Sequence, residues 1–432
     1  MKAVKSRLII DGTGNKSIEN GVILVENGKI SRIGTSSQVA IPSGTEIIDV
    51  GDQVILPGLI DPHRHLSPMD ERPFHVKTND TDAYKALWAA RVVREDLKHG
   101  ITTIRLLGQP GWWSFDFRKA VDDGVTAGPR ILNAGRGVRS AAGHGYFGTP
   151  TTGVDNIRQV LRENFEKGAD CVKLYITGGG SSPEIPPLDT SYYSKEEIEA
   201  AVEEAHRVGV KTAAHCEGGI GGTWFIEAGG DSIEHGSALT DAQMDLMAKK
   251  GTYFGITLWI ADLKSLKEYY GNERTRDYLG KDESRSWLET DRVIQAAVRE
   301  RKRKKDVHAP YAETIKKAIS KKVKYTTHGD QQFATIPWNI MTLVKTCGIS
   351  PMDAILANTR NGADCCGILD RVGTLEPGKY ADMISVKGNP LEDITNIQRT
   401  GMVMLGGRVY DPVTGYWKSF ETIEQLRCFS YY

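Results

Sequence analysis

Two hydrophobic patterns follow one another along the chain. Near the N-terminus apolar and polar residues alternate, and Asn27-Gly28 separates the strand-like segments 22–25 and 29–33. Alternation with a period of two is typical of half-buried strands, and Asn-Gly between two such runs predicts a β-hairpin. The same pattern returns over residues 381–410. We therefore expect the two chain ends to build one small β domain together.

Between the two ends, apolar strand-like runs alternate with helix-like segments. This order is typical of βαβ units and a parallel sheet. Eight such units predict an α/β fold, a (β/α)8 TIM barrel, whose active site lies at the C-terminal ends of the strands. The expected strands are 54–61, 101–107, 129–134, 169–176, 210–215, 231–235, 251–257 and 322–328.

These patterns divide the chain of 432 residues into two expected domains. Residues 1–54 and 370–432 would form a composite β-sandwich, and residues 55–369 the barrel. Residues 258–310 are too long for an ordinary connection and predict an inserted lid. Its basic run, 299–305, is either a solvated helix face or a nucleic-acid patch, and the balanced overall charge favours the first.

The segment 194–208 shows the helix pattern most clearly. Ser194 and Glu197 have the spacing of a capping box, and Gly209 predicts the end of the helix. Apolar residues recur on one face at helical spacing, which predicts that this face is buried. They are Ile198, Ala201, Val202 and Ala205.

The charge balance narrows the class of partner. Lys plus Arg and Asp plus Glu number 55 each, which argues against nucleic acid or a membrane and favours a small-molecule substrate. The six cysteines show no Cys-x-x-Cys spacing and the N-terminus no signal-peptide pattern, so we expect a reduced, cytoplasmic protein. A homo-oligomer is also expected.

Two histidines end the first apolar strand of the expected barrel. His63 and His65 are two residues apart, so on an extended strand both imidazoles point to the same side and can converge on one ion. The alternative is a pair of surface histidines in a turn.

Four more polar residues lie at the ends of later strands. Lys173 interrupts an inner-strand run, where lysine is rarely buried without a partner, so it is either functional or paired with a carboxylate. His215 and His235 could each be a hydrogen-bonded core histidine. Together with Asp330, just past the eighth strand, they predict a metal centre.

Longer motifs surround these residues. The apolar lead-in Pro57–Asp61 precedes His63-Arg64-His65, and Gly373–Asp382 reads Gly-Thr-Leu-Glu-Pro-Gly-Lys-Tyr-Ala-Asp. In both motifs the chain resembles the amidohydrolase superfamily of metal-dependent hydrolases, in the branch with two metal ions and a carbamylated lysine. The resemblance runs nearly end to end and implies the same barrel and β domain.

The resemblance also implies roles for the six strand-end residues. Lys173 would carry a CO2-derived carbamate that bridges two divalent ions, expected to be zinc. Asp330 would act as general base toward a water whose pKa the ions lower, so that a metal-activated hydroxide attacks the substrate. The implied ligands are His63, His65 and Asp330 for one ion and His215 and His235 for the other.

Within the superfamily, some motifs resemble the group related to Xaa-Pro dipeptidase and imidazolonepropionase. These are Ala134-Gly135-Arg136, Gly143-His144-Gly145 and Asn389–Ile394. The resemblance implies that Arg136 and His144 contact the substrate. The alternative is that both are solvated loop residues.

Other candidate substrate contacts are a residue that departs from the family's usual motif and a pair of adjacent tryptophans. His328-Gly329-Asp330 stands where relatives commonly have Gly-Thr-Asp, which makes His328 a candidate. Trp112 and Trp113 follow the second strand. Core packing explains one of them, because two adjacent residues of a strand cannot both face inward, so the other is expected to line the pocket or the lid.

The sequence therefore predicts a metal-dependent hydrolase that cleaves an amide C–N bond of a small substrate, such as a dipeptide or an N-acyl amino acid. The alternative substrates are a xenobiotic or aromatic amide, a carbamate, a urea or a cyclic amide. A metal-free binding protein on the same fold is the non-enzyme alternative. It would require lost ligands, and none of the six positions is lost.

Overall fold

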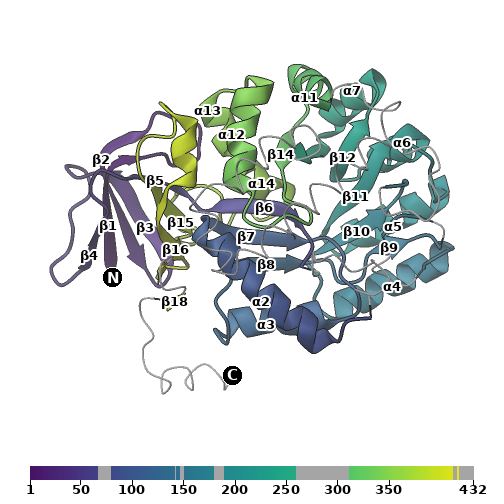
Figure 1. The fold of residues 1–432 in the computed structure, drawn as a ribbon, viewed down its shortest axis with the longest axis horizontal. Helices are drawn as coiled ribbons and strands as arrows, with labels where there is room; N and C mark the ends of the chain where they lie inside the picture. The colour runs from purple at the N-terminus through teal and green to yellow at the C-terminus, as the bar shows by residue number, and fades with distance from the viewer. Residues whose placement is uncertain are drawn as a thin grey trace, which may run out of the picture.

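The computed structural model describes residues 1–66, 79–141, 143–145, 150–179, 189–258 and 311–411, with the backbone of 416–417. Figure 1 shows a β-sheet part that contains the N-terminus beside a larger α/β part. Apart from residue 258, the predicted insertion 258–310 with its basic run lies outside the described residues.

A nine-stranded sheet combines strands from both chain ends, in the order β18-β17-β16-β15-β5-β1-β2-β3, with β4 beside β1. The ends meet where β5 pairs antiparallel with β15. The composite sheet is thus present, while its division into a two-layer sandwich stays a prediction. The strands are β1 (Lys2–Ile9), β2 (Ile18–Glu26), β3 (Lys29–Thr35), β4 (Glu46–Asp49), β5 (Val54–Pro57), β15 (Met383–Val386), β16 (Thr400–Leu405), β17 (Arg408–Asp411) and β18 (Tyr416–Trp417).

The predicted hairpin is confirmed. Strands β2 and β3 pair antiparallel, and Asn27 and Gly28 between them have φ angles of 50° and 75°. Two successive positive φ angles are what a tight hairpin turn needs, and asparagine and glycine adopt them at low cost. The neighbours Ala3 and Val4 on β1 belong to separate buried clusters, so both faces of the sheet are covered.

Two parallel sheets form the α/β part. One contains β6 (Leu59–Arg64), β7 (Ile101–Leu106) and β8 (Arg130–Asn133). The other has the order β14-β13-β12-β11-β10-β9. Its strands are β9 (Val138–Arg139), β10 (Cys171–Tyr175), β11 (Lys211–Gly218), β12 (Ser232–Ala238), β13 (Tyr253–Ile256) and β14 (Tyr325–Thr327).

The strand predicted over 54–61 is wrong in one respect, because it divides into β5 and β6 at Gly58. A Cβ at Gly58 would collide with the Thr102 side chain. Glycine therefore permits the close approach at which the chain leaves the nine-stranded sheet for the parallel one. Each of the seven later predicted strands overlaps one observed strand, although β11 and β12 run three residues past the predicted ends. The observed strands are β7, β8, β10, β11, β12, β13 and β14.

Backbone contacts connect the two parallel sheets at both edges. Arg64 on β6 forms a parallel bridge with Asp330, just after β14. At the other edge, the amide of Asp170 donates to the carbonyl of Asn133 at 2.9 Å. The C-terminal ends of β6 and β14 are thereby brought together.

Helices cover the outer side of the parallel strands (Figure 1). The predicted helix over 194–208 is α5, and its Ser194–Glu197 capping box is present. No helix in the described ranges is both long and apolar enough to cross a membrane. The helices are α2 (Asp82–Lys98), α3 (Trp113–Asp122), α4 (Val154–Glu166), α5 (Lys195–Arg207), α6 (Gly219–Glu227), α7 (Asp241–Lys250), α11 (Tyr311–Ser320), α12 (Ile336–Cys347), α13 (Pro351–Ala357) and α14 (Arg360–Cys365).

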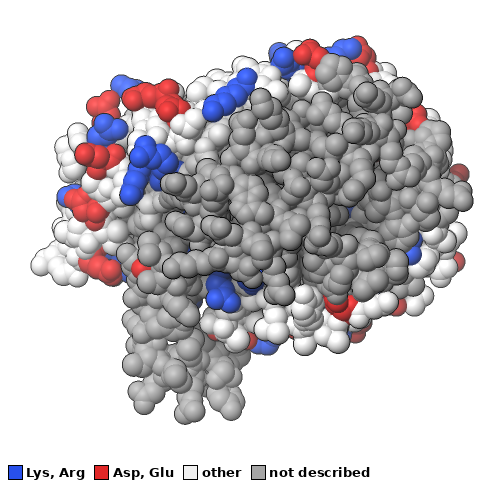
Figure 2. All heavy atoms as spheres, in the orientation of Figure 1, with Lys and Arg blue, Asp and Glu red and all other residues white. Residues whose placement is uncertain are grey.

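Charged side chains of both signs share the visible surface. Figure 2 shows Lys and Arg lying among Asp and Glu on the described part of this face, most clearly over the nine-stranded sheet at the left. The surface there is mixed in charge, as the equal numbers of basic and acidic residues predict.

Candidate metal centre

The residues predicted to bind metal lie at or near the C-terminal ends of five parallel strands. His63 is on β6, Lys173 on β10, His215 on β11 and His235 on β12, while His65 and Asp330 follow β6 and β14. All six side chains are buried.

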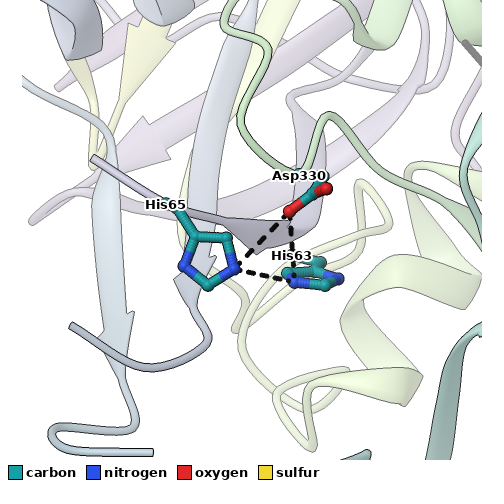
Figure 3. A group of neighbouring side chains, drawn as sticks. All are labelled: His63, His65 and Asp330. Atoms are coloured by element: carbon teal, nitrogen blue, oxygen red, sulfur yellow. Dashed lines mark hydrogen bonds and ion pairs between the residues drawn. The ribbon is translucent and has the colours of Figure 1, made fainter. Parts of the chain in front are cut away.

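His63, His65 and Asp330 converge on one point (Figure 3). The two Nε2 atoms are 3.2 Å apart, and Asp330 Oδ1 lies 3.6 Å from His63 Nε2 and 3.5 Å from His65 Nε2. Ligands about 2.0–2.2 Å from a tetrahedral ion are separated by roughly 3.3–3.6 Å. The three atoms therefore fit one shared divalent ion.

The protonation of the two imidazoles suits this role. His65 Nδ1 lies 3.1 Å from the carbonyl oxygen of Gly108, which can only accept, so Nδ1 carries the proton and Nε2 the lone pair. Burial, followed by the charge of Lys173, holds the pKa of both His63 and His65 well below the ordinary value. Both rings are therefore neutral near pH 7.

Lys173 lies next to His63 in the buried interior. Its Nζ is 3.5 Å from His63 Nε2 and 5.0 Å from the ring centroid of Tyr175. Burial lowers the pKa of Lys173 to about 8, although the carboxylates of Glu234 and Asp330 oppose the shift. More of this amine is therefore neutral near pH 7 than is usual for lysine, and only a neutral amine can react with CO2.

His215 and His235 form a second pair beside the first. Their ring centroids are 4.6 Å apart, and that of His235 is 5.3 Å from that of His63. His215 Nε2 lies 2.9 Å from the carbonyl oxygen of Gly178, which leaves Nδ1 with the lone pair. His235 Nδ1 is 2.8 Å from Thr257 Oγ1. Each ring is therefore oriented by one nitrogen, as metal-binding histidines commonly are.

His235 has an unusual backbone conformation. Its φ angle is 76°, in the left-handed region that side chains rarely adopt, and its carbonyl accepts a hydrogen bond from the Tyr311 hydroxyl. Such a conformation costs on the order of 1–3 kcal/mol and persists only where its surroundings enforce it. The role of Tyr311 was not predictable from the sequence, because its contact with His235 depends on the position of α11.

Glu234 is a further buried group that sequence reasoning missed. Its Oε2 lies 3.4 Å from both His63 Nδ1 and His328 Nε2. Its Oε1 accepts hydrogen bonds from Arg105 at 3.1 Å and from Ser232 at 2.7 Å. Glu234 can thus orient the ring of His63 from the side opposite Nε2. The sequence offered one signal for Glu234, namely its position on a predicted strand directly before His235 and two residues after Ser232, with which it shares a side of the strand.

His328 is fully buried and contacts the centre directly. Its ring centroid is 4.4 Å from that of His63, and its Nε2 is 3.3 Å from Thr257 Oγ1. Burial lowers the pKa of His328 to about 4, against the opposing charge of Glu234. The ring is therefore neutral near pH 7, and its role as a substrate contact stays a prediction.

His144, the predicted substrate contact, lies beside one of the candidate metal ligands. Its ring stacks on His215 with centroids 4.0 Å apart and lies 5.7 Å from Tyr175. A Cβ at Gly179 would lie 2.5 Å from His144 Nδ1, so this close approach requires glycine. The side chain is half-buried. A substrate at the centre could therefore reach it.

Arg136, Trp112 and Trp113 make their contacts with α3 and α4. Arg136 pairs with Glu163 of α4, and its guanidinium lies 4.4 Å from the ring centroid of Trp112. Trp113 is 3% exposed and belongs to the main core beside Phe117. The two tryptophans lie at the start of α3 and not on a strand, so that Trp113 packs into the core while Trp112 is half-buried beside Arg136. Their roles as substrate contacts stay predictions.

Comparison with known proteins identifies similar chains. The model of the Amidohydrolase family matches residues 54–410. Ochratoxinase from Aspergillus niger is 26% identical over 447 residues, covering 95% of this chain and 87% of that protein.

Solved structures also resemble the protein over nearly its full length. A Xaa-Pro dipeptidase with methionine bound in its active site has a TM-score of 0.78 and 27% identity, covering 95% of this chain and 99% of that one. Phenylurea hydrolase B has a TM-score of 0.74 at 19% identity, covering 96% and 98%, which shows a shared fold.

Proposed function

Because the chain belongs to the Amidohydrolase family and is a hydrolase that acts on carbon–nitrogen bonds, we propose that it cleaves the amide bond of a dipeptide or an N-acyl amino acid. One observation carries the proposal, namely the convergence of His63 Nε2, His65 Nε2 and Asp330 Oδ1 within 3.2–3.6 Å of one another. The dipeptidase with bound methionine supports the substrate class.

The donor set fits two divalent ions, with zinc as the proposed metal. Histidine nitrogens and a carboxylate are ligands that zinc prefers. Lys173 would bridge the two ions as a carbamate, formed when its neutral amine adds to CO2 and releases a proton. The carbamate is an anion with two oxygens, whereas an ammonium cannot ligate a cation. The proposed ligands are His63, His65 and Asp330 for one ion and His215 and His235 for the other.

When bound, the ions would lower the pKa of a water and polarise the scissile carbonyl. Asp330 would accept the proton of this water and return it to the leaving nitrogen, a role worth roughly 10²- to 10⁴-fold in rate. Glu234 would hold the ring of His63 in the orientation that presents Nε2, since its Oε2 lies 3.4 Å from Nδ1.

Substrate binding would involve His144 first, because it stacks on His215 and is half-buried. Further proposed contacts are Arg136, His328, Trp112 and Trp113. Their neighbours in the protein are, in the same order, Glu163, Glu234, Arg136 and Phe117.

The proposal extends to the architecture. The two parallel sheets would form one (β/α)8 barrel over residues 55–369, with the metal centre at the C-terminal ends of its strands, as in other barrel enzymes. Residues 1–54 and 370–432 would form the β-sandwich domain. The bridge between Arg64 and Asp330 and the contact between Asp170 and Asn133 support closure of the barrel.

A second candidate substrate is an aromatic or xenobiotic amide, a carbamate, a urea or a cyclic amide. The half-buried ring of His144 offers a surface on which an aryl group could stack. The attack on the carbonyl would be the same for both classes.

A substrate screen of the zinc-loaded protein separates the two candidates. We expect dipeptides or N-acyl amino acids to be hydrolysed with a kcat/KM at least tenfold above that of aryl amides and ureas, an energy difference of about 1.4 kcal/mol. A preference for aryl ureas or carbamates would favour the second candidate. Asp330→Asn, assayed in parallel, would show that the hydrolysis belongs to this centre.

A further inference from the structure

The arginine between the two histidines is buried and turned away from them. Arg64 is 1% exposed. Its Nη1 donates to the carbonyl oxygen of Gln332 at 2.8 Å and to that of Asp330 at 3.2 Å. Successive residues of a strand point to opposite sides. His63 and His65 therefore face the carboxylate of Asp330, while Arg64 on the other side bonds the backbone of the loop that begins at Asp330.

A second buried side chain completes this contact. Asp96 on α2 is 0% exposed, and its Oδ2 lies 3.3 Å from Arg64 Nη2. Its Oδ1 accepts a hydrogen bond from the amide of Ala334 at 2.7 Å. Arg64 and Asp96 therefore hold the loop 330–334 at both ends, and Arg64 also lies 3.6 Å from the buried carboxylate of Asp61.

The loop 330–334 contains two residues in an unfavourable backbone conformation. Asp330 and Ala334 have φ angles of 56° and 58°, both in the left-handed region. A Cβ at Gly329 would collide with the carbonyl oxygen of Gln332, so the turn is also tightly folded. Non-glycine residues keep such conformations only where surrounding contacts over-determine them. Arg64 and Asp96 supply three of those contacts.

We propose that Arg64 and Asp96 act as a clamp that positions the carboxylate of Asp330 toward His63 and His65. The clamp touches neither substrate nor ion, so both are positioning residues. The effect of the clamp on metal binding and on the rate of hydrolysis rests on the proposed function. Its effect on the conformation of the loop 330–334 does not. The backbone bonds of Asp330 to His63 and His65, at 2.8 and 2.9 Å, fix one end of the loop only.

Two variants test the clamp. Arg64→Lys keeps the charge but cannot bond Asp96 and two carbonyls at once, because it lacks the planar fork of arginine. Asp96→Asn retains an acceptor for Ala334 and loses the ion pair. The matched control is Arg130→Lys, which weakens a partly buried pair with Asp382 at 3.0 Å, remote from the histidines in sequence and contacts.

The first readout needs no metal. We expect the Ala334 amide to exchange with deuterium at least tenfold faster in Arg64→Lys and in Asp96→Asn than in the parent protein, and unchanged in Arg130→Lys. Unchanged exchange at Ala334 in both clamp variants would overturn the inference. Circular dichroism and thermal unfolding would show that each variant folds.

The second readout follows Asp330 itself. Titration of the metal-free protein with Co2+ should show one site weakened roughly 10- to 100-fold in the clamp variants, with an altered visible spectrum, and kcat reduced by a similar factor. KM should change less than kcat, because the substrate contacts are untouched. Faster exchange with parental cobalt affinity and kcat would show that the loop is held but Asp330 is not positioned, and would also overturn the inference.

The two hypotheses fail in different ways. A parent protein that binds no Co2+ would contradict the proposed function, while the exchange comparison would still decide whether the clamp holds the loop. Two bound ions in the parent and parental behaviour in both clamp variants would overturn the clamp alone.

Discussion

The proposed function gives the Asp330 carboxylate two tasks, those of a metal ligand and a general base. The same Oδ1 lies 3.6 Å from His63 Nε2 and 3.5 Å from His65 Nε2. For Asp330→Asn we expect kcat to fall roughly 10²- to 10⁴-fold, because an amide oxygen can still face an ion but cannot accept a proton. Steady-state kinetics at saturating zinc, with elemental analysis of the same sample, provides the measurement.

At least one ion should remain in Asp330→Asn, since four histidines are unchanged. A parental kcat would remove Asp330 from the role of general base. His328 would then be the candidate, because its ring lies 4.4 Å from that of His63 and is neutral near pH 7.

Lys173 provides the sharpest test of the two-ion centre. Lys173→Ala should remove the bridging anion, so the second ion dissociates and activity collapses while the fold persists. Formate or acetate at high concentration should restore part of the metal content and the rate, because a small carboxylate offers the same two oxygens. Metal content and kcat are measured with and without the added anion.

A different rescue would identify a different role for Lys173. If the ammonium of Lys173 paired with a carboxylate, ethylamine would restore activity and acetate would not. Retention of both ions after the substitution would likewise contradict the carbamate.

At the scale of elements, Asp231 connects α5 to the starts of β11 and β12. It accepts hydrogen bonds from His206 of α5 at 2.8 Å, from Lys211 at 2.7 Å and from the Thr212 amide at 2.8 Å. Burial acts to raise the pKa of Asp231, but these bonds outweigh it, and its pKa lies below the ordinary 3.8. The charged carboxylate therefore stabilises the folded state above about pH 4.

This stabilisation should disappear in acid. We expect Asp231→Asn to lower the free energy of unfolding by about 1–3 kcal/mol at pH 7. The difference from the parent should shrink as the pH falls from 4 toward the lowered pKa, because the parent then protonates the same carboxylate. Urea unfolding of both proteins at a series of pH values measures this difference in the free energy of unfolding.

An exposed ion pair provides the control for Asp231. Asp245→Asn breaks the pair with Lys321, in which the Asp245 side chain is 62% exposed. Asp245→Asn should lower the free energy of unfolding by less than about 1 kcal/mol. A pH-independent loss in Asp231→Asn would show that packing and not charge is responsible.

Helices and strands were predictable where they depend on interactions between residues close together in the sequence. Alternation placed His63 and His65 on one side of a strand, and the capping box placed the start of α5. The partnership of Arg64 with Asp96 was not predictable, because it depends on how α2 lies against β6. Trp112 and Trp113 were expected in the loop after the second strand, and the structure begins a helix there.

At the scale of the molecule, the candidate metal centre draws its residues from both parallel sheets. His63 comes from the sheet that contains β6, and Lys173, His215 and His235 come from the other. Ions bound only by the folded chain stabilise it, by about 2.7 kcal/mol per ion at a free concentration 100-fold above Kd. We expect chelation to lower the Tm by on the order of 5 °C.

Elemental analysis should accompany the melting curves and find about two divalent ions per chain, because six ligand-capable groups exceed what one tetrahedral site needs. One tightly bound ion at full activity would indicate a mononuclear enzyme. A chain without metal, with an unchanged Tm after chelation, would contradict the metal centre.

The pairing of β5 with β15 has a consequence for synthesis on the ribosome. Val54–Pro57 leaves the exit tunnel about 300 residues before Met383–Val386, the strand it pairs with in the finished sheet. At about 5–20 residues per second, the delay is roughly 15–60 s. Throughout that interval one edge of β5 lacks its native neighbour, and an apolar strand with an open edge invites pairing with other chains. Newly made chains would therefore depend most on chaperones while residues 58–382 are being translated.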